Sequence, residues 1–338
     1  MQFLCFFLAS ILISFAWLSP FHTYPWVTFS SELASFGAAL AVGGLLFNKS
    51  VKIPRPQILM LGIVLIPLSQ WSLGLITDFS TAFLSFSYLF IFWLMIIAGY
   101  NLSLQAEQRE RIMLGVSYLL LSISFISAIM AIIQWLNLEA YLDAVMKLRG
   151  NRPYANFGQP NNLATFLIMG LMGGLYLYEK RRLTLWLLIP TSLVTLFAIT
   201  LTQSRTSWVV CIFLFFYWIF KQYKNSPRFN FPRLLLWVGL YFVIASYLLP
   251  VLTQLLSSSI DTGVTQTASI VQRAGSGHER LGMWVQILHA IAERPWFGYG
   301  WNQTSIAVFE SIDFNTVQVW FNSAHNVLLD ILVWNGVP

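Results

Sequence analysis

"IMLGVSYLLLSISFISAIMAIIQWL", residues 112–136, contains no Asp, Glu, Lys or Arg. An α-helix needs only ~20 such residues to cross the hydrocarbon core of a bilayer. Comparable apolar runs occur along the rest of the chain, near residues 3–19, 31–47, 57–76, 81–100, 161–178, 183–203, 207–220 and 234–256, and another starts near residue 324. The sequence therefore predicts an all-α, polytopic integral membrane protein with about 9–10 transmembrane helices.

The composition supports the same fold class. Hydrophobic residues make up 57% of the 338 residues and charged residues only 9%, and the mean hydropathy is +0.68. Soluble domains carry about 25% charged residues, so a water-soluble globular protein is excluded. The formal charge of +6 lies in short loops, so it predicts membrane orientation rather than a nucleic-acid partner. Cys5 and Cys211 lie inside apolar runs and indicate neither disulfides nor a zinc site.

The charges of the loops predict the orientation of the chain. Loops after the first and third apolar runs contain no Lys or Arg. The loops after the second, fourth, sixth and eighth runs hold Lys49, Lys52, Arg55, Arg109, Arg111, Lys180, Arg181, Arg182, Lys221, Lys224, Arg228 and Arg233. By the positive-inside rule these basic loops face the cytoplasm, and so does the amino terminus. The first run lacks a cleavage site, so it predicts a retained helix rather than a signal peptide.

Two long segments lie on the opposite, outer side. The first comprises residues 137–160 and begins within the stretch "LNLEAYLDAVMKLRG". The apolar spacing of this stretch predicts an amphipathic helix on the membrane surface. The second, residues 257–323, begins with a polar stretch rich in Ser, Thr and Gly. The predicted organisation is an N-terminal transmembrane bundle (1–136), an outer segment (137–166), a transmembrane core (167–256), a long outer loop (257–323) and the start of a further helix (324–338).

The outer side carries six arginines, where the positive-inside rule disfavours them. They are Arg149, Arg152, Arg205, Arg273, Arg280 and Arg294, with Lys147 as the seventh basic residue. A guanidinium presents a planar, permanently charged fork to phosphate oxygens, so Arg205 in "LTQSRTSW" and Arg280 in "GHERLGMW" are candidates for binding an anion. The alternatives are a snorkelling Arg205 at a helix end and a solvated Arg280; Arg273 and Arg294 have the pattern of loop or helix-end charges.

The segment "NRPYANFGQPNNLATF", residues 151–166, is unusually polar for this chain. One interpretation is a simple helix start after Pro160, capped by Asn161 or Asn162. The other places Arg152, Asn156, Gln159 and Asn161 over a cavity at the membrane surface. A cap needs only one Asn, whereas several amides and an arginine suit a sugar or diphosphate headgroup.

His325 lies in "NSAHNVLLDILVW", where the long outer loop enters the last apolar run. A neutral imidazole can accept a proton near pH 7, so His325 is a candidate general base beside Asn322, Ser323 and Asn326. The alternative is an interfacial polar residue. Asp330, inside the last run, is an ionisable residue at membrane depth and could orient a neighbour.

Sequence motifs exclude several kinds of site. The chain has no phosphate-binding loop, dinucleotide fingerprint, zinc-protease helix or nucleophile elbow. The outer acidic residues are scattered, with no D-x-D and no paired carboxylates. The sequence therefore predicts neither a metal nor a cofactor.

Four segments follow one another between apolar helices: "RPYANFGQPNNLATFL" (152–167), "LTQSRTSW" (201–208), "ERLGMW" (279–284) and "SAHNVLLDILVWNG" (323–336). Together they resemble the bacterial PglL-type protein O-oligosaccharyltransferases, the pilin-glycosylating members of the O-antigen ligase/polymerase (Wzy-C) superfamily. The resemblance covers roughly residues 140–338. "FGQPNNLATFL" is its most specific part and marks the protein-glycosylating branch; an arginine and a late "HN" alone would fit lipopolysaccharide ligases equally.

The resemblance implies a multi-pass enzyme of the bacterial inner membrane with its active site in the periplasm. Such an enzyme moves a glycan en bloc from undecaprenyl diphosphate to a Ser or Thr hydroxyl of a periplasmic protein such as pilin, with inversion and without a metal. The roles carried over by motif are His325 as catalytic base, Arg205 and Arg280 as ligands of the donor diphosphate, and Gln159, Asn161 and Asn326 as substrate contacts.

Other functions stay open from the sequence. An O-antigen ligase or polymerase uses the same donor with a lipid A-core or glycan acceptor. A transporter of lipid-linked sugars binds the same headgroup without chemistry, but the crowding of polar residues on the outer side favours an enzyme. Members of the family continue with further helices after the histidine. We therefore expect a chain that ends at Pro338 to be truncated, with a loosely held last helix and little activity.

Overall fold

The computed structural model describes residues 2–205 with gaps at 23, 25 and 48, scattered positions between 207 and 255, and residues 277–311 and 322–337. Within these residues the chain forms helices and no strands. It divides into two compact units, Met1–Ala41 with Ser103–Arg273, and Val42–Leu102 with Ala274–Pro338. The predicted runs at 207–220 and 234–256 lie largely outside the described residues, and Arg273 lies wholly outside them.

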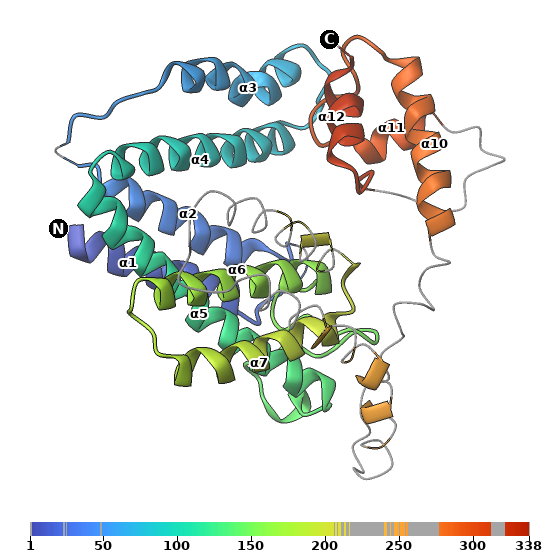
Figure 1. Ribbon diagram of the computed structural model, residues 1–338. Coiled ribbons are helices and arrows are strands. Elements are labelled where there is room, and N and C mark those ends of the chain that lie inside the picture. The colour runs from blue at the N-terminus through green and yellow to red at the C-terminus, as the bar shows by residue number, and fades with distance from the viewer. Residues whose placement is uncertain are drawn as a thin grey trace. The chain divides into compact units, whose positions relative to one another are not determined.

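The helices of the two units are labelled in Figure 1. The first unit contains α1 (Gln2–Leu18), most of α2 (Phe29–Gly44), α5 (Ala106–Trp135), the 3-10 helix η1 (Glu139–Tyr141), α6 (Pro160–Glu179) and α7 (Leu185–Thr202). The second unit contains α3 (Arg55–Ser72), nearly all of α4 (Phe79–Ser103), α10 (Gly277–Glu293), α11 (Thr304–Glu310) and α12 (Val327–Asn335). Each of the first seven predicted apolar runs therefore coincides with one of the helices α1 to α7.

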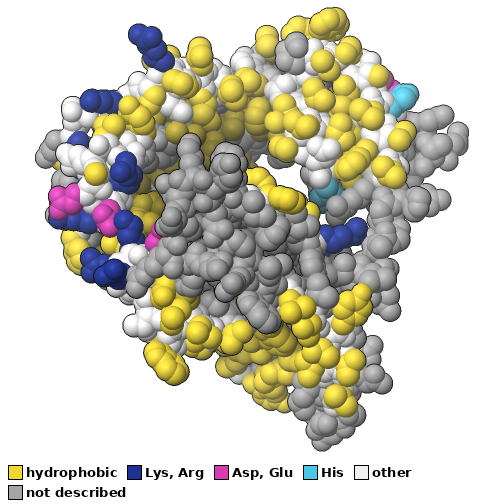
Figure 2. Space-filling view, in the orientation of Figure 1, with side chains coloured by type: hydrophobic (Ala, Val, Ile, Leu, Met, Phe, Trp, Pro, Cys, Tyr) yellow, Lys and Arg dark blue, Asp and Glu magenta, His cyan; other side chains and the backbone are white. Residues whose placement is uncertain are grey.

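The described helices have the length and surface of a membrane protein. Three of them, α4, α5 and α7, are long and apolar enough to cross a membrane, and α1 is a shorter apolar helix. Large apolar side chains are exposed, such as Trp186 at 90% and Leu59 at 80%, and hydrophobic side chains dominate the described surface in Figure 2. Contiguous apolar surface on this scale is unfavourable in water. The chain is an all-α membrane protein, as predicted.

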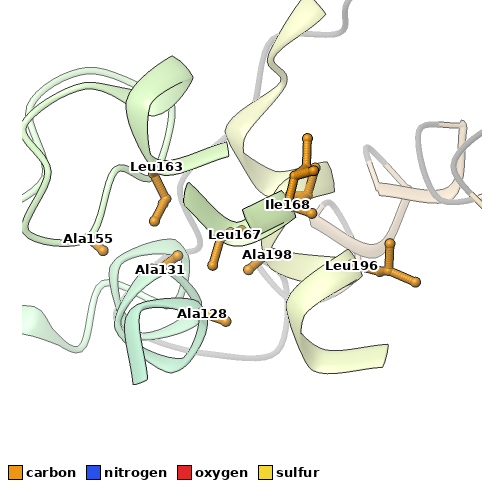
Figure 3. Packing of buried hydrophobic residues seen from close by; sticks show 9 residues of the cluster. Ala128, Ala131, Ala155, Leu163, Leu167, Ile168, Leu196 and Ala198 are labelled. Atoms are coloured by element: carbon orange, nitrogen blue, oxygen red, sulfur yellow. The ribbon is translucent and has the colours of Figure 1, made fainter. Parts of the chain in front are cut away.

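Helices α5, α6 and α7 pack side by side and form the core of the first unit (Figure 1). Small residues let α5 and α6 approach closely, as is common between membrane helices. A Cβ atom on Gly173 would lie 2.9 Å from the Ser117 carbonyl oxygen, and one on Gly170 would overlap the Ser124 side chain. The buried cluster beyond this contact comprises Ala128, Ala131, Ala155, Leu163, Leu167, Ile168, Leu196, Ala198 and Ile199 (Figure 3).

The basic loops of the first unit lie together at one end of this helix packing. Lys180 Nζ is 3.0 Å from Glu110 Oε1, and the Tyr118 hydroxyl donates to the Arg182 carbonyl oxygen at 3.2 Å. The N-terminal part of α5 and the loop after α6 therefore meet. Because α6 runs from Pro160 to Glu179, the polar segment before Pro160 lies at the opposite end of this helix.

The second unit is closed by the contacts of α12 with a glycine-containing turn. The Tyr299 and Gly300 amides donate to the carbonyl oxygens of Val333 and Trp334 at 2.8 and 3.0 Å. Gly298 and Gly300 both have positive φ, at 63° and 100°, which glycine adopts without steric cost. The sequence "WFGYGW" therefore forms a turn.

Arg294 is a helix-end charge, as predicted. Its guanidinium forms an ion pair of 2.6 Å with Glu310 and lies 4.5 Å from the centre of the Tyr299 ring. Burial of Tyr299, together with the nearby Glu293 carboxylate, raises the pKa of its hydroxyl to about 12. The side chain of Arg294 is thus engaged within its own unit.

The amphipathic helix predicted for "LNLEAYLDAVMKLRG", at the start of the outer segment, is wrong. Only the 3-10 turn η1 forms there, and residues 142–159 are irregular. The Leu148 amide donates to Glu139 Oε1 at 3.3 Å, and the Met146 amide donates to Asn156 Oδ1 at 2.9 Å. Side chains thus replace the helical partners of this backbone, an alternative that apolar spacing cannot reveal.

Candidate functional site

A buried glutamine on α5 holds the irregular segment 142–159 in place. Gln134 is fully buried, and its Nε2 donates to the carbonyl oxygens of Met146 and Ala155, both at 2.9 Å. Its Oε1 accepts from the amides of Tyr154 and Ala155 at 2.9 and 2.7 Å. Ala155 has a positive φ of 49°, a conformation that needs such support in a non-glycine residue. Gln134 therefore fixes the turn before the "FGQPN" motif.

The sequence prediction missed Gln134. A usable signal existed, because an amide inside a strongly apolar run is costly unless its groups are bonded. The position of its partners, twelve to twenty-one residues later in the chain, could not be read from that signal.

Asn156 also supports this segment, so the prediction that it hangs over a cavity is wrong. Its Nδ2 donates to the carbonyl oxygens of Leu18 and Ala144 at 2.6 and 2.8 Å, and its Oδ1 accepts from Met146. Its own carbonyl oxygen lies 3.1 Å from Nε2 of His22. The side chain is 3% exposed, because its amide is bonded to backbone groups on both sides of it.

Arg152 joins two of the motifs that the sequence singled out. Its Nε donates to the Thr202 carbonyl oxygen at 2.7 Å, and its Nη2 donates to Asn161 Oδ1 at 3.1 Å. Thr202 is the last residue of α7. The "RPYANFGQPN" segment is therefore attached directly to the start of "LTQSRTSW".

The chain turns immediately after this contact and presents Arg205. Gln203 ends α7 in the left-handed conformation, with φ 48°, and its Nε2 donates to the Thr200 carbonyl oxygen at 2.9 Å. Gln203 and Ser204 are buried, at 4% and 2% exposure, whereas Arg205 is exposed. The structure thus brings Arg152, Asn161 and the turn that carries Arg205 into one place.

The start of α6 differs from the predicted cap. Gln159 occupies the capping position, Pro160 is the first helical residue, and among the described residues no side chain caps this end. The Asn161 oxygen is instead bonded to Arg152, and Gln159 is exposed. Proline suits the first helical position because its missing N–H has no helical partner there. An uncapped helix N-terminus favours negative charge nearby.

A pocket of about 400 Å³ lies beside this helix start. It contains two arginines, Arg149 and Arg152, together with the polar and aromatic side chains expected of a sugar or phosphate site. It is lined by His22, Tyr24, Val27, Met146, Arg149, Gly150, Asn151, Arg152, Tyr154, Gly158 and Pro160. The segment therefore does border a cavity, but through Arg152 and neighbouring residues rather than through Asn156.

In the second unit, His325 stands on a tightly bonded bend before α12. Its φ is 50° and its side chain is exposed. The His325 amide donates to Ser323 Oγ at 3.0 Å. The Ser323 hydroxyl donates to Asp330 Oδ2 at 2.9 Å, and the Ala324 amide donates to Asp330 Oδ1, also at 2.9 Å. Asp330 therefore does orient a neighbour: it holds the residues that precede His325.

The other candidate residues of this unit have different positions. Asn326 caps α12, because its Oδ1 accepts from the Leu328 amide at 3.1 Å. Arg280 belongs to α10 by its backbone, while its side chain lies outside the described residues. The first unit thus carries Gln159, Asn161 and Arg205, and the second carries Arg280, His325 and Asn326. Within the described residues, no three His, Cys, Asp or Glu side chains gather as metal ligands would.

Family models match the segments that hold these residues. The model described as O-antigen ligase matches residues 190–338, which include Arg205, Arg280 and His325. The model described as protein glycosylation ligase matches residues 153–178, which include Gln159 and Asn161. No solved structure matches the chain.

Two relatives from Acinetobacter baylyi match nearly the whole chain. A general O-oligosaccharyltransferase is 50% identical over 336 residues, 99% of this chain and 59% of that protein. A ComP-specific O-oligosaccharyltransferase is 29% identical over 318 residues, 91% of this chain and 56% of that protein. The chain thus spans little more than half the length of these relatives. It belongs to the O-antigen ligase (Wzy-C) superfamily, on the branch of the protein O-oligosaccharyltransferases.

Proposed function

We propose that the chain transfers a preassembled glycan en bloc from undecaprenyl diphosphate to a Ser or Thr hydroxyl of a periplasmic protein such as pilin. The observation that carries this proposal is the junction made by Arg152, which ties Asn161 of the "FGQPN" motif to the α7 end that precedes Arg205. It lies beside a pocket of about 400 Å³ that two arginines line. The relatives named as O-oligosaccharyltransferases support the same reaction class.

In this proposal arginines bind the donor diphosphate. The leaving group is negative, and guanidinium groups aimed at it stabilise the charge that develops as the sugar departs. Arg205 and Arg280 have this role, with the uncapped start of α6 contributing its dipole. Gln159 and Asn161 contact the headgroup or the first sugar. The bonds from Arg152 to Thr202 and Asn161 hold this end of the site rigid.

His325 acts as the general base. A hydroxyl is a weak nucleophile at neutral pH, and a histidine within hydrogen-bond reach takes its proton as the oxygen attacks C1 of the first sugar. The C1–oxygen bond to the diphosphate breaks in the same step, so the anomeric configuration inverts. The arginines supply the positive charge that the leaving group requires, so the proposed reaction uses no metal. The exposure of the His325 side chain leaves it accessible to a protein acceptor, and Asn326 is placed next to it.

The proposed location is the bacterial inner membrane, with the active site facing the periplasm. The ion pair of Lys180 with Glu110 joins the loop after α6 to the N-terminal part of α5, where Arg109 and Arg111 lie. The positive-inside rule places these basic segments in the cytoplasm. The polar segment then faces the periplasm. Transfer to lipid A-core is the second candidate, because the longer matching family model is described as O-antigen ligase; the match at residues 153–178 favours a protein acceptor.

The test is glycan transfer in cells that lack their own transferase and that supply the lipid-linked glycan, a pilin acceptor and core lipid. The variants are made in a parental protein in which this chain is extended to the length of its relatives, and we expect glycosylated pilin from that parental protein. His325→Ala should bind the donor but transfer ~10²–10⁴-fold more slowly, and Arg205→Lys should weaken donor use because a lysine lacks the bidentate fork.

Matched controls are His289→Ala, since His289 lies beside Glu293 at 3.3 Å on the exposed surface of α10, and Arg182→Lys in the opposite loop. Both should transfer at the parental rate. Glycan on core lipid but not on pilin would establish the ligase instead. Parental transfer by His325→Ala would remove the base assignment.

A further inference from the structure

We propose that Asp330 is a positioning residue for His325 and that it acts through the Ser323 hydroxyl. This inference rests on the proposed function, in which His325 is the base. Asp330 is on α12 and is 5% exposed. Its two carboxylate oxygens accept hydrogen bonds from the Thr304 hydroxyl, the Ser323 hydroxyl and the Ala324 amide, each at 2.9 Å.

The carboxylate fixes the direction of both hydroxyl groups. The Thr304 and Ser323 hydroxyls both donate to Asp330, so their protons point at its carboxylate. Each hydroxyl oxygen is then left with lone pairs for a further donor. The Thr304 oxygen accepts from Trp334 Nε1 at 2.7 Å, and the Ser323 oxygen accepts from the His325 amide at 3.0 Å. One continuous chain of bonds therefore leads from the buried carboxylate to the backbone of His325.

The residue before His325 is fixed on both sides. The Ala324 amide is bonded to Asp330, and the Ala324 carbonyl oxygen accepts from Trp284 Nε1 of α10 at 2.9 Å. Ala324 is fully buried. On the other side, Asn326 caps α12. The backbone of His325 is thus held between two anchored residues.

This support is needed because His325 has a φ of 50°. The left-handed conformation is unfavourable for a residue with a Cβ atom, and it persists only where the surroundings determine it. If the bond from Ser323 to the His325 amide is lost, the backbone can relax toward negative φ, and the imidazole then points in a different direction. A base that is misplaced by about 1 Å can lose ~10²-fold in rate.

Thr304 provides a built-in comparison. Its hydroxyl meets the same carboxylate at the same distance as that of Ser323, but among the described bonds only Ser323 continues to His325. If Asp330 served only to hold the unit together, the loss of either hydroxyl would have the same kind of effect. A positioning role predicts instead that kcat falls on loss of the Ser323 hydroxyl but not on loss of the Thr304 hydroxyl.

The experiment compares Ser323→Ala, Ser323→Thr and Thr304→Ala in the same extended parental protein, with kcat and KM for glycan transfer and the thermal midpoint measured for each. We expect Ser323→Ala to lower kcat roughly 10- to 100-fold with KM for the donor unchanged, and Ser323→Thr, which keeps the hydroxyl, to restore most of it. Thr304→Ala should lower the thermal midpoint but keep kcat within about twofold.

Asp330→Asn is the second variant should Ser323→Ala fail to fold. It keeps the shape of the side chain but cannot accept the Ser323 proton through its amide nitrogen, so its kcat should fall further than that of Thr304→Ala. Equal losses of kcat in the serine and threonine variants, in step with their thermal midpoints, would overturn the positioning role while His325→Ala stays inactive. Full transfer by His325→Ala would instead overturn the base assignment, and the inference with it.

Discussion

Replacing Gln134 with leucine should release the segment that precedes the "FGQPN" motif. The substitution keeps a similar side-chain volume but removes four hydrogen bonds, to the carbonyl oxygens of Met146 and Ala155 and to the amides of Tyr154 and Ala155. Tyr154 and Ala155 are 5% and 0% exposed, so their polar groups gain no water in exchange. Only local opening of the segment can satisfy them again.

The loss in the free energy that keeps the segment closed follows from the number of hydrogen bonds lost. Leaving a buried donor or acceptor unpaired costs about 1–3 kcal/mol, and the groups on Tyr154 and Ala155 are the most buried of the four. The expected loss is about 3–6 kcal/mol of the free energy that keeps the segment closed. Since 1.4 kcal/mol corresponds to a factor of ten, the population of the open segment should rise about 100-fold or more.

Trypsin provides the assay. The segment contains Lys147 and Arg149, whereas cleavage after Arg152 is blocked by Pro153. In the parental chain the Lys147 carbonyl oxygen and the Arg149 amide are both bonded to the Tyr154 hydroxyl, which disfavours the extended form that a protease requires. Cleavage that passes through local opening follows the population of the open state. Rates at Lys147 and Arg149 should therefore rise about 100-fold in Gln134→Leu.

The control is Gln108→Leu, the same substitution near the other end of α5. It should leave both cleavage rates unchanged, because Gln108 lies about seven turns of helix away from the segment. Donor binding should fall in Gln134→Leu alone, since Met146 and Tyr154 line the pocket. Cleavage of Gln134→Leu within twofold of the parental rate would show that Gln134 does not hold this segment.

Two further predictions concern the packing and the orientation of the first unit. Gly170→Ala should destabilise the protein in detergent by about 1–3 kcal/mol or more through overpacking, because its Cβ would overlap Ser124 and lie 3.1 Å from the Leu120 carbonyl oxygen. Gly99→Ala is the control and should not destabilise the protein, because there is open space at its Cβ. An equal thermal midpoint for the two variants would contradict the close contact of α5 and α6. A cysteine in place of Asn151 should react with an impermeant thiol reagent added to intact spheroplasts, and a cysteine in place of Arg181 should react only after permeabilisation; the reverse pattern would invert the proposed topology.

The helices were predictable from the sequence because each is determined locally. A run such as residues 112–136 needs only its own apolar side chains and its own backbone bonds to form α5. The positions of Arg205 and His325 next to helix ends followed from the same pattern. The amphipathic helix predicted for "LNLEAYLDAVMKLRG" was wrong for the converse reason. Its backbone is bonded to the Glu139 and Asn156 side chains, and such partners depend on the fold rather than on spacing.

The candidate residues were found more readily than the residues that support them. Arg205, Gln159 and His325 stand in segments whose polarity interrupts apolar runs. Nothing in the sequence pairs Gln134 with Ala155, or Thr304 with Asp330, since these contacts join residues 21 and 26 positions apart through the fold. Two of the supporting side chains, Gln134 and Asp330, are nevertheless polar residues inside apolar helices, so their presence could be noticed even though their partners could not.

Gln134 and Asp330 both provide hydrogen-bond partners for irregular backbone. Irregular backbone near the hydrocarbon of a membrane must find its hydrogen-bond partners within the protein. In the first unit Gln134 of α5 supplies them to the turn at Ala155, and in the second Asp330 of α12 supplies them to the bend at His325. Both turns contain a non-glycine residue with positive φ, at 49° and 50°, which a free loop would abandon. A rigid helix that carries one polar side chain can therefore hold a strained loop in a single conformation at the membrane boundary. That arrangement suits the proposed site, in which charged and basic groups would be presented to a lipid-linked substrate without being reorganised by the lipid around it.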